Sequence, residues 1–206
     1  MRCYIDTDIF LKLVAFNLFE RILQALDIPL DNVYFGPETL SKCSHGEKTK
    51  QVFRVEIWKR ASKYVKKCKQ IVDAVDHDEL AELVKVPAID SGEAILFAAT
   101  KGQQDFLLLT GDKRALCALK NHFFDQEVYQ RHVGRIICLE TALLLLVKKD
   151  GFDAIRNDLK KEQHCDTAIR TALTAEDKQP GSFVASLTEL AQKLQQETEG
   201  LLKELS

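Results

Sequence analysis

Proline and glycine are scarce in this chain, with four prolines and nine glycines among 206 residues. Disordered and low-complexity segments are rich in both, so their scarcity argues against long disordered stretches. Long apolar runs are missing as well, and the longest covers only residues 142–147. A transmembrane helix needs about 20 apolar residues, so we expect no membrane segment. The hydrophobic content of 46% is enough for one domain with an appendage.

Cysteines and histidines spaced for a metal site are also missing. The six cysteines, at positions 3, 43, 68, 117, 138 and 165, include no C-x-x-C pair, and the five histidines form no metal-spaced pair. Both observations argue against a structural zinc site. The cysteines show no disulfide-like clustering, which favours a reducing compartment. The N-terminal run meets the charge of Asp6 too early for a signal peptide, so we expect a cytoplasmic protein.

A large net charge is missing too, since 29 Lys and Arg residues nearly balance 31 Asp and Glu residues. Any preference for nucleic acid must therefore be local. Residues 42–69 hold such a local excess, with ten Lys and Arg residues against two acids. Phe53, Trp58 and Tyr64 lie between these basic residues.

This basic segment predicts an RNA-facing surface, because a basic stripe with aromatic residues is typical of nucleic-acid binding. One alternative is that the basic side chains form a solvated surface without a ligand. The other is that the acids of residues 73–82 neutralise the basic segment within the chain. The nucleic-acid-binding candidates are the basic side chains of this segment and two that follow a later strand. They are Arg54, Lys59, Arg60, Lys63, Lys66, Lys67, Lys113 and Arg114.

Strand-like apolar runs alternate with helical spacing along the first 150 residues. Strands are predicted at 2–5, 33–35, 106–109 and 135–139, and helices at 9–26, 47–71, 77–84, 91–102, 112–121 and 140–147. Alternating strands and helices predict a mainly parallel sheet. We therefore expect a three-layer α/β/α sandwich with a mainly parallel four- or five-stranded sheet, plus a helical C-terminal appendage.

The strand signals stop after residue 150, and helices are predicted at 152–162 and 166–175. We assign residues 1–150 to one domain, with a basic helical insertion at about 42–85, and residues 151–206 to a helical C-terminal extension. The last segment has a 4-3-4-3-4 stripe, typical of a coiled-coil seam or a docking helix. The stripe is Leu187, Ala191, Leu194, Thr198, Leu201 and Leu205. It must pack on the domain, on a second copy or on another protein, and we expect a homo-oligomer, with a dimer favoured over a monomer.

Acidic residues follow successive strands of the expected sheet. Asp6 ends the first strand, Asp90 and Glu93 begin an apolar helix, and Asp112 comes just after the strand at 106–109. Parallel strands direct the residues at their carboxyl ends into one crevice, so these carboxylates should meet there. Crowded carboxylates repel each other unless a cation is bound, and Mg²⁺ prefers oxygen ligands. Each acid is also a good helix cap, and capping alone is the simpler interpretation of each one.

Three segments together resemble the PIN-domain family of metal-dependent ribonucleases. They are Tyr4-Ile5-Asp6-Thr7-Asp8, then Asp90-Ser91-Gly92-Glu93-Ala94, then Leu108-Leu109-Thr110-Gly111-Asp112-Lys113-Arg114. The resemblance covers roughly residues 2–147. It implies a PIN-like fold and an endoribonuclease that uses Mg²⁺ or Mn²⁺ to hydrolyse single-stranded RNA.

The resemblance also implies roles for residues. Asp6 and Asp112 would ligate the metal directly or through water, and Glu93 or Asp90 would complete the site. Thr7 or Thr110 would hold a metal-ligating side chain or a metal-bound water in position without contacting the metal. Glu38 is the candidate for a further catalytic acid, with Glu47 as its alternative. A toxin or a defence component is the implied setting, in which an antitoxin or complex subunit would bind the C-terminal helices.

Two other functions stay open at this stage. Asp6-Thr7-Asp8 resembles the nucleophile and acid of haloacid-dehalogenase-like phosphatases, but Phe10 and Leu116 depart from that family's motifs. An 18-residue first helix also suits the ribonuclease better. The third interpretation is an inactive PIN-like module that binds RNA or protein, against which the retained acids argue.

Overall fold

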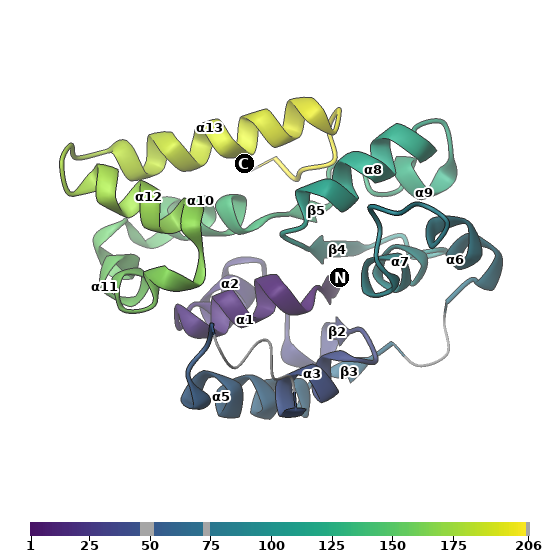
Figure 1. Ribbon diagram of the computed structural model, residues 1–206, viewed down its shortest axis with the longest axis horizontal. Coiled ribbons are helices and arrows are strands. Elements are labelled where there is room, and N and C mark those ends of the chain that lie inside the picture. The colour runs from purple at the N-terminus through teal and green to yellow at the C-terminus, as the bar shows by residue number, and fades with distance from the viewer. Residues whose placement is uncertain (46–51, 72–74, 205–206) are drawn as a thin grey trace.

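The centre of the computed structural model, which describes residues 1–45, 52–71 and 75–204, is a five-stranded sheet (Figure 1). Its strands are β1 (Arg2–Ile5), β2 (Val33–Phe35), β3 (Lys69–Gln70), β4 (Phe106–Leu109) and β5 (Ile136–Ile137). They lie in the order β3-β2-β1-β4-β5, and each neighbouring pair is parallel. The predicted parallel sheet is thus confirmed at five strands.

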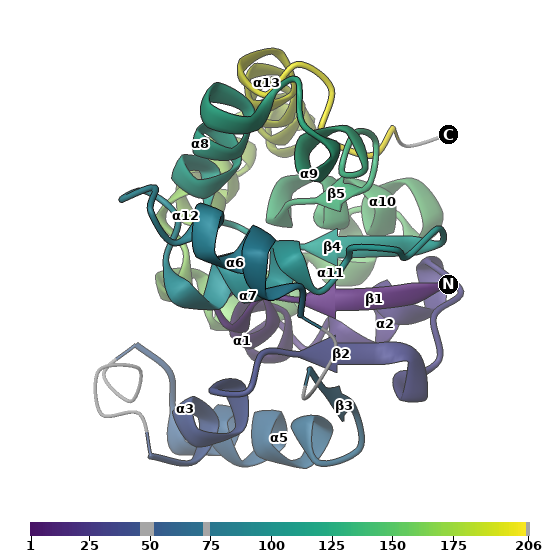
Figure 2. The same ribbon diagram turned by 90° about the vertical axis from the view of Figure 1, so that its right-hand side faces the viewer.

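Side chains alternate between the two faces of the sheet and enter two separate hydrophobic clusters. Cys3 and Ile5 belong to one cluster, whereas Tyr4 between them belongs to the other. Helices cover both faces, which makes three layers (Figure 2). The first cluster includes residues of α1 (Thr7–Ala15), α2 (Phe19–Ala25), α3 (Thr39–His45), α5 (Val55–Val65), α10 (Leu139–Asp150), α11 (Asp153–Lys161) and α12 (Thr167–Glu176). The second includes residues of α6 (His77–Leu83), α7 (Ser91–Ala98), α8 (Lys113–Phe123) and α9 (Glu127–Gln130). Short 3₁₀ helices, η1 (Leu30–Asn32) and η2 (Gln163–Cys165), precede β2 and α12.

The predicted single helix over residues 9–26 is two helices, α1 and α2. Asn17 breaks it with a left-handed φ of 57°, a conformation that Asn adopts more readily than most residues. Arg60 of α5 stabilises this break, because its guanidinium donates to the Val14 carbonyl oxygen (2.6 Å) and to the Asn17 side-chain oxygen (3.2 Å). The long first helix therefore no longer separates the two candidate enzyme classes.

The basic segment also differs from the predicted helix at 47–71. Glu47, Lys48 and Lys50 fall within residues 46–51, which lie outside the described part of the chain. α5 covers only Val55–Val65, and Lys69 and Gln70 form β3 beside β2. Residues 69–70 form a strand because they pair with Tyr34 and Phe35. The sequence pattern of such a short segment has no periodicity that could predict this pairing.

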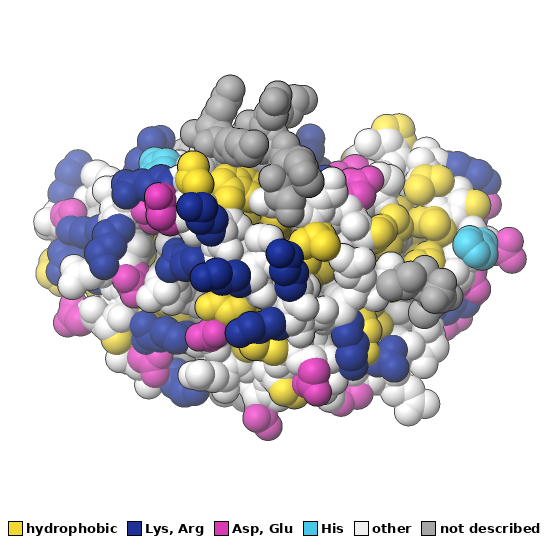
Figure 3. Space-filling model, turned by 90° about the horizontal axis from the view of Figure 1, so that it is seen from below, with side chains coloured by type: hydrophobic (Ala, Val, Ile, Leu, Met, Phe, Trp, Pro, Cys, Tyr) yellow, Lys and Arg dark blue, Asp and Glu magenta, His cyan; other side chains and the backbone are white. Residues whose placement is uncertain are grey.

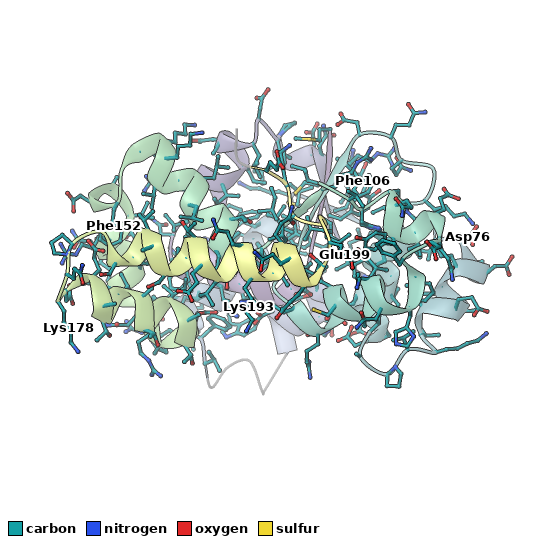
Figure 4. The ribbon with its side chains drawn as sticks, turned by 90° about the horizontal axis from the view of Figure 1, so that it is seen from above. Asp76, Phe106, Phe152, Lys178, Lys193 and Glu199 are labelled. Carbon is teal, nitrogen blue, oxygen red and sulfur yellow. The ribbon has the colours of Figure 1, made fainter. Side chains whose placement is uncertain are left out.

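The C-terminal segment packs on the rest of the chain. α13 (Ser182–Glu197) runs along the top of the molecule, from the end near Phe152 and Lys178 toward Glu199 (Figure 4). It contacts α10 and α12, and Leu202 forms a parallel bridge with Ile136 beyond the edge strand β5. The stripe contributes Leu187 to the first cluster and Ala191, Leu194 and Leu201 to the second; Leu205 lies outside the described residues.

The described residues of the stripe are therefore buried within one chain, and the expected dimer stays a prediction. The predicted boundary at residue 150 falls at the end of α10, but the helices after it share the clusters of the sheet. Among the described residues, no helix is long and apolar enough to cross a membrane.

Truncation of the fully buried Leu187 should test this packing. Leu187→Ala removes buried methyl groups from the first hydrophobic cluster, and we expect it to lower the free energy of unfolding by about 2–4 kcal/mol. The matched control is Val184→Ala on the same helix, where the side chain is 37% exposed and the expected change is within about 0.5 kcal/mol. Urea unfolding followed by circular dichroism measures both. Equal midpoints for the two variants would show that α13 does not pack as described.

Candidate functional site

A pocket of about 340 Å³ opens at the carboxyl edge of the sheet. β1 and β4 are neighbours in register, so the residues that follow them emerge side by side. Asp6 comes from the end of β1, Asp112 from the end of β4, and Asp90 and Glu93 from the start of α7. The pocket is lined by Asp6, Thr7, Asp8, Leu11, Lys42, Asp90, Glu93, Gly111 and Asp112. All four predicted metal ligands thus face one pocket.

The capping interpretation of these acids is also correct. The Asp6 carboxylate accepts the backbone N–H groups of Thr7 (2.7 Å) and Asp8 (3.3 Å) at the start of α1. The Asp112 carboxylate accepts those of Arg114 (2.8 Å) and Ala115 (3.0 Å) at the start of α8. A carboxylate offers about four lone-pair sites, so these bonds leave capacity for another ligand.

Asp90 and Glu93 form a capping box at the start of α7. Asp90 accepts the Glu93 N–H at 2.9 Å, and Glu93 accepts the Asp90 N–H at 2.8 Å. Asp90 is exposed at the mouth of the pocket, whereas Glu93 is only 7% exposed. The box therefore fixes a buried carboxyl group beside a solvated one.

The crowding of these acids changes their proton affinities. Burial, together with the charges of Asp8 and Asp90, raises the pKa of Asp6 to about 6. Burial raises the pKa of Glu93 to about 8, and the charges of Asp112 and Asp90 add to the rise. Burial also acts to raise the pKa of Asp112, but the Ala115 N–H and the Arg114 guanidinium outweigh it and lower that pKa.

Glu93 and Asp112 are hydrogen-bonded through their side chains, so the pair titrates as a unit. The lowered pKa of Asp112 and the raised pKa of Glu93 mean that the shared proton lies on Glu93. The metal-free pocket thus lowers its own charge by retaining protons.

The donor set suits a hard divalent cation. Five carboxyl groups and one lysine line the pocket, and oxygen-only donors are typical of Mg²⁺ and Mn²⁺ sites. A second group of potential metal ligands lies at residues 162–165, apart from the pocket. Among the described residues it is the one group of three or more whose ligand atoms all lie within 4.8 Å of one another. The pocket acids do not form such a group, so a Mg²⁺ ion there would keep several of its waters, as this ion usually does.

The neighbouring predicted residues have defined positions. The Thr7 hydroxyl lies 3.0 Å from the Thr39 hydroxyl, and the Thr110 hydroxyl accepts the Asp112 N–H at 3.3 Å. Both threonines therefore support the segments that carry the acids. Glu38 does not line the pocket: it is paired with Lys42 at 3.1 Å and lines a smaller hollow next to it.

Three predicted RNA-binding lysines line one groove. Lys59 and Lys63 of α5 and Lys66, directly after it, line a groove of about 500 Å³ together with Cys43 of α3. Figure 3 shows Lys and Arg side chains gathered on this face of the molecule. Lys67 is exposed on the same helical end.

The other basic candidates have partners within the chain. Arg54 faces Glu162 at 3.5 Å, Lys113 pairs with the buried Glu140 at 2.7 Å, and Arg114 pairs with Asp112 at 3.2 Å. Arg60 holds the α1–α2 break and is not free to track a phosphate backbone. The aromatic residues Phe53 and Trp58 are buried against each other, with ring centroids 5.9 Å apart.

Sequence reasoning gave too little weight to several side chains. Asp8 lines the pocket, although its sequence position suggests a cap or flank, and Lys42 lines it from α3. Glu140 lies in the first turn of α10, after β5. The reasoning that identified Asp6, an acid just after a predicted strand, could therefore also have identified Glu140 as a candidate. The group at residues 162–165 holds Glu162, His164 and Cys165, three ligand types almost adjacent in sequence.

Comparisons with protein-family models, with curated proteins and with solved structures found no match to this chain. The resemblance to the PIN-domain family therefore rests on the residues and on the pocket alone.

The raised pKa values predict how the metal-free protein responds to pH. Asp6 and Glu93 have ordinary pKa values of 3.8 and 4.5, and folding raises them to about 6 and about 8. Between about pH 4 and 8 the folded state consequently binds more protons than the unfolded state, so stability falls as the pH rises through this window. Glu93→Gln mimics the protonated group and keeps the capping acceptor. We expect it to raise the free energy of unfolding by about 1–3 kcal/mol at about pH 8.5 and to leave it nearly unchanged at about pH 5.

Urea unfolding in EDTA at both pH values measures this effect. Glu189→Gln, at an exposed position of α13, is the control and should change stability at neither pH. Equal destabilisation by Glu93→Gln at the acidic and the alkaline pH would contradict the described repulsion.

Proposed function

We propose that this chain is a metal-dependent endonuclease with a PIN-like fold that hydrolyses phosphodiester bonds in single-stranded RNA. The observation that carries the proposal is the convergence of Asp6, Asp90, Glu93 and Asp112 on one pocket at the carboxyl ends of β1 and β4. Ligands of open parallel sheets bind in this crevice. A pocket this acidic repels a phosphate unless a cation intervenes, which links the charge of the site to metal-assisted chemistry.

The residues would divide the work by position. Asp6 and Asp112, at the ends of adjacent strands, would hold Mg²⁺ or Mn²⁺ directly or through water, and Glu93 and Asp90 would complete the shell. The bound cation would polarise the scissile phosphate and acidify a water molecule. Thr7 and Thr110 would keep the strand ends in place, and Lys42 would neutralise part of the phosphate charge at the pocket wall.

The basic groove adjoins the pocket through α3. Lys42 of this helix lines the pocket, and its neighbour Cys43 lines the groove with Lys59, Lys63 and Lys66. A single strand that follows these lysines would lead its backbone past α3 to the acids. Because Phe53 and Trp58 are buried, we expect contacts to phosphates rather than stacking on bases, and hence weak sequence preference.

A phosphatase remains the second candidate, because Asp8 lines the same pocket as Asp6. The Asp8 carboxylate is paired with Lys12 at 2.7 Å, so it is already engaged by a side chain of the same helix. An inactive RNA- or protein-binding module is the third. As a setting we propose a toxin or a defence component, with a protein partner on the outer faces of the C-terminal helices.

Loss of the strand-end acids should abolish cleavage while the fold persists. Asp6→Asn and Asp112→Asn each retain a good helix cap, since Asn caps as well as Asp. We expect each to reduce cleavage of labelled single-stranded RNA at least about 100-fold, because loss of a supporting outer contact alone costs about 10–100-fold. Wild-type cleavage should require Mg²⁺ or Mn²⁺ and stop in EDTA.

Asp125→Asn, at an exposed position beyond α8, is the control and should cleave like the wild type. Cleavage that persists in EDTA or in Asp112→Asn would overturn the proposal. Cleavage of DNA alone would change the substrate but keep the chemistry. Hydrolysis of p-nitrophenyl phosphate that depends on Asp8 would favour the phosphatase.

The groove lysines should control the salt dependence of RNA binding. In the Asp112→Asn background, the triple change of Lys59, Lys63 and Lys66 to Glu should weaken binding. It should also reduce the log–log salt slope by about 0.7 for each phosphate that the protein no longer neutralises, or about 2 in all. The matched control reverses three lysines that do not line the groove, Lys148, Lys149 and Lys178, which are exposed on α10 and after α12. Fluorescence anisotropy over a range of NaCl concentrations measures both slopes, and equal slopes would remove the groove from the RNA path.

A further inference from the structure

Three potential metal ligands converge at the corner between α11 and α12. Glu162, His164 and Cys165 lie around η2, and their ligand atoms are all within 4.8 Å of one another. The His164 Nε2 atom lies 3.8 Å from the Glu162 Oε2 atom and 3.7 Å from the Cys165 Sγ atom. A tetrahedral zinc ion with usual bond lengths separates such ligand atoms by roughly 3.4–3.6 Å. The two measured separations are therefore slightly longer than those between the ligand atoms of a tetrahedral zinc ion.

One buried atom of this group has no hydrogen bond to the described part of the chain. Glu162 is 8% exposed, and its Oε2 atom is buried without a hydrogen bond from any described residue. The Oε1 atom faces the Arg54 Nε at 3.5 Å, so only Oε2 points toward the imidazole. An unpartnered buried carboxylate oxygen is costly, and a bound cation would satisfy it.

The chemistry of the donors selects the ion. A thiolate and an imidazole with one carboxylate suit Zn²⁺, whereas Mg²⁺ prefers oxygen donors only. His164 is 47% exposed at its side chain, so the ion can enter from solvent, and water can take the fourth position. In the described state the His164 Nε2 atom lies 3.0 Å from the Val52 carbonyl oxygen, a contact that it would exchange for the metal bond.

We propose that Glu162, His164 and Cys165 bind one Zn²⁺, separate from the acidic pocket. The site lies against Val52 and Arg54, the residues that lead into α5. A bound ion would fasten the corner between α11 and α12 beside the N-terminal end of α5, the helix that carries the groove lysines. Binding releases the thiol proton of Cys165, as metal–thiolate bonds require.

Cobalt titration of the full chain tests this assignment. Excess Mg²⁺ is added to compete with Co²⁺ for oxygen ligands such as the pocket acids, and Co²⁺ then reports a thiolate ligand through its sulfur-to-metal charge-transfer band. We expect one equivalent of Co²⁺ to produce this band and one equivalent of Zn²⁺ to remove it. Cys165→Ser should abolish the band, and His164→Gln should weaken Zn²⁺ binding at least about tenfold, measured by competition with a coloured chelator.

The controls are a half-buried cysteine and an exposed histidine of α8, changed as Cys117→Ser and His122→Gln. Both should bind Co²⁺ and Zn²⁺ like the wild type. Because His164 is half-exposed, its Gln variant should fold, and Zn²⁺ should raise the melting temperature of the wild type but not of this variant. Absence of the charge-transfer band, or a band that survives Cys165→Ser, would overturn the site and leave the proposed nuclease untouched.

Discussion

The hydrogen bond from the Asp6 N–H to the Leu109 carbonyl oxygen, 2.9 Å long, closes the ladder between β1 and β4. It continues a parallel register in which Ile5 lies opposite Leu109. The chain leaves both strands at the same level, so the turn at Thr110–Asp112 must pass beside Asp6. Every other feature of the pocket depends on this alignment, because a slip of one residue would direct the acids to opposite faces.

The same carboxylates serve the fold and the site. Helix N-termini follow the strands directly, so the residue that caps a helix is also the residue at the mouth of the crevice. The backbone N–H groups that bind Asp6 and Asp112 reduce the cost of concentrating negative charge there. Glu93 has the least compensation, since it is the most buried of the four and has two acids beside it. The local stability of the capped helices and the electrostatic strain of the pocket therefore arise from one arrangement.

The sequence predicted the elements and site residues that local patterns determine, and it missed those that tertiary contacts determine. Asp6 and Asp112 were recognisable because apolar runs end just before them, and the parallel sheet followed from alternating elements. The break at Asn17 was not recognisable, because the apolar spacing continues through it. The contact that stabilises the break comes from Arg60, which is distant in sequence. β3 was hidden because a two-residue edge strand has no period of its own. Phe53 and Trp58 showed the aromatic spacing of an RNA surface, yet they pack inward. Glu162, His164 and Cys165 escaped a search for spaced pairs because the chain turn at η2, not a helix face or a hairpin, brings their atoms together.

The position of β1 has a consequence for how the protein is made. Of the five strands, β1 is translated first, but it lies in the middle of the sheet and pairs with β4, which follows roughly a hundred residues later. At about 5–20 residues per second, the nascent chain waits about 5–20 s for that partner. During this time Ile9 and Phe10, which are fully buried in the finished protein, have no sheet to cover them, and Asp6 has no Asp112 beside it. The first helices of a newly synthesised chain would therefore expose apolar side chains, and the acidic pocket would not exist until Asp112 had been translated.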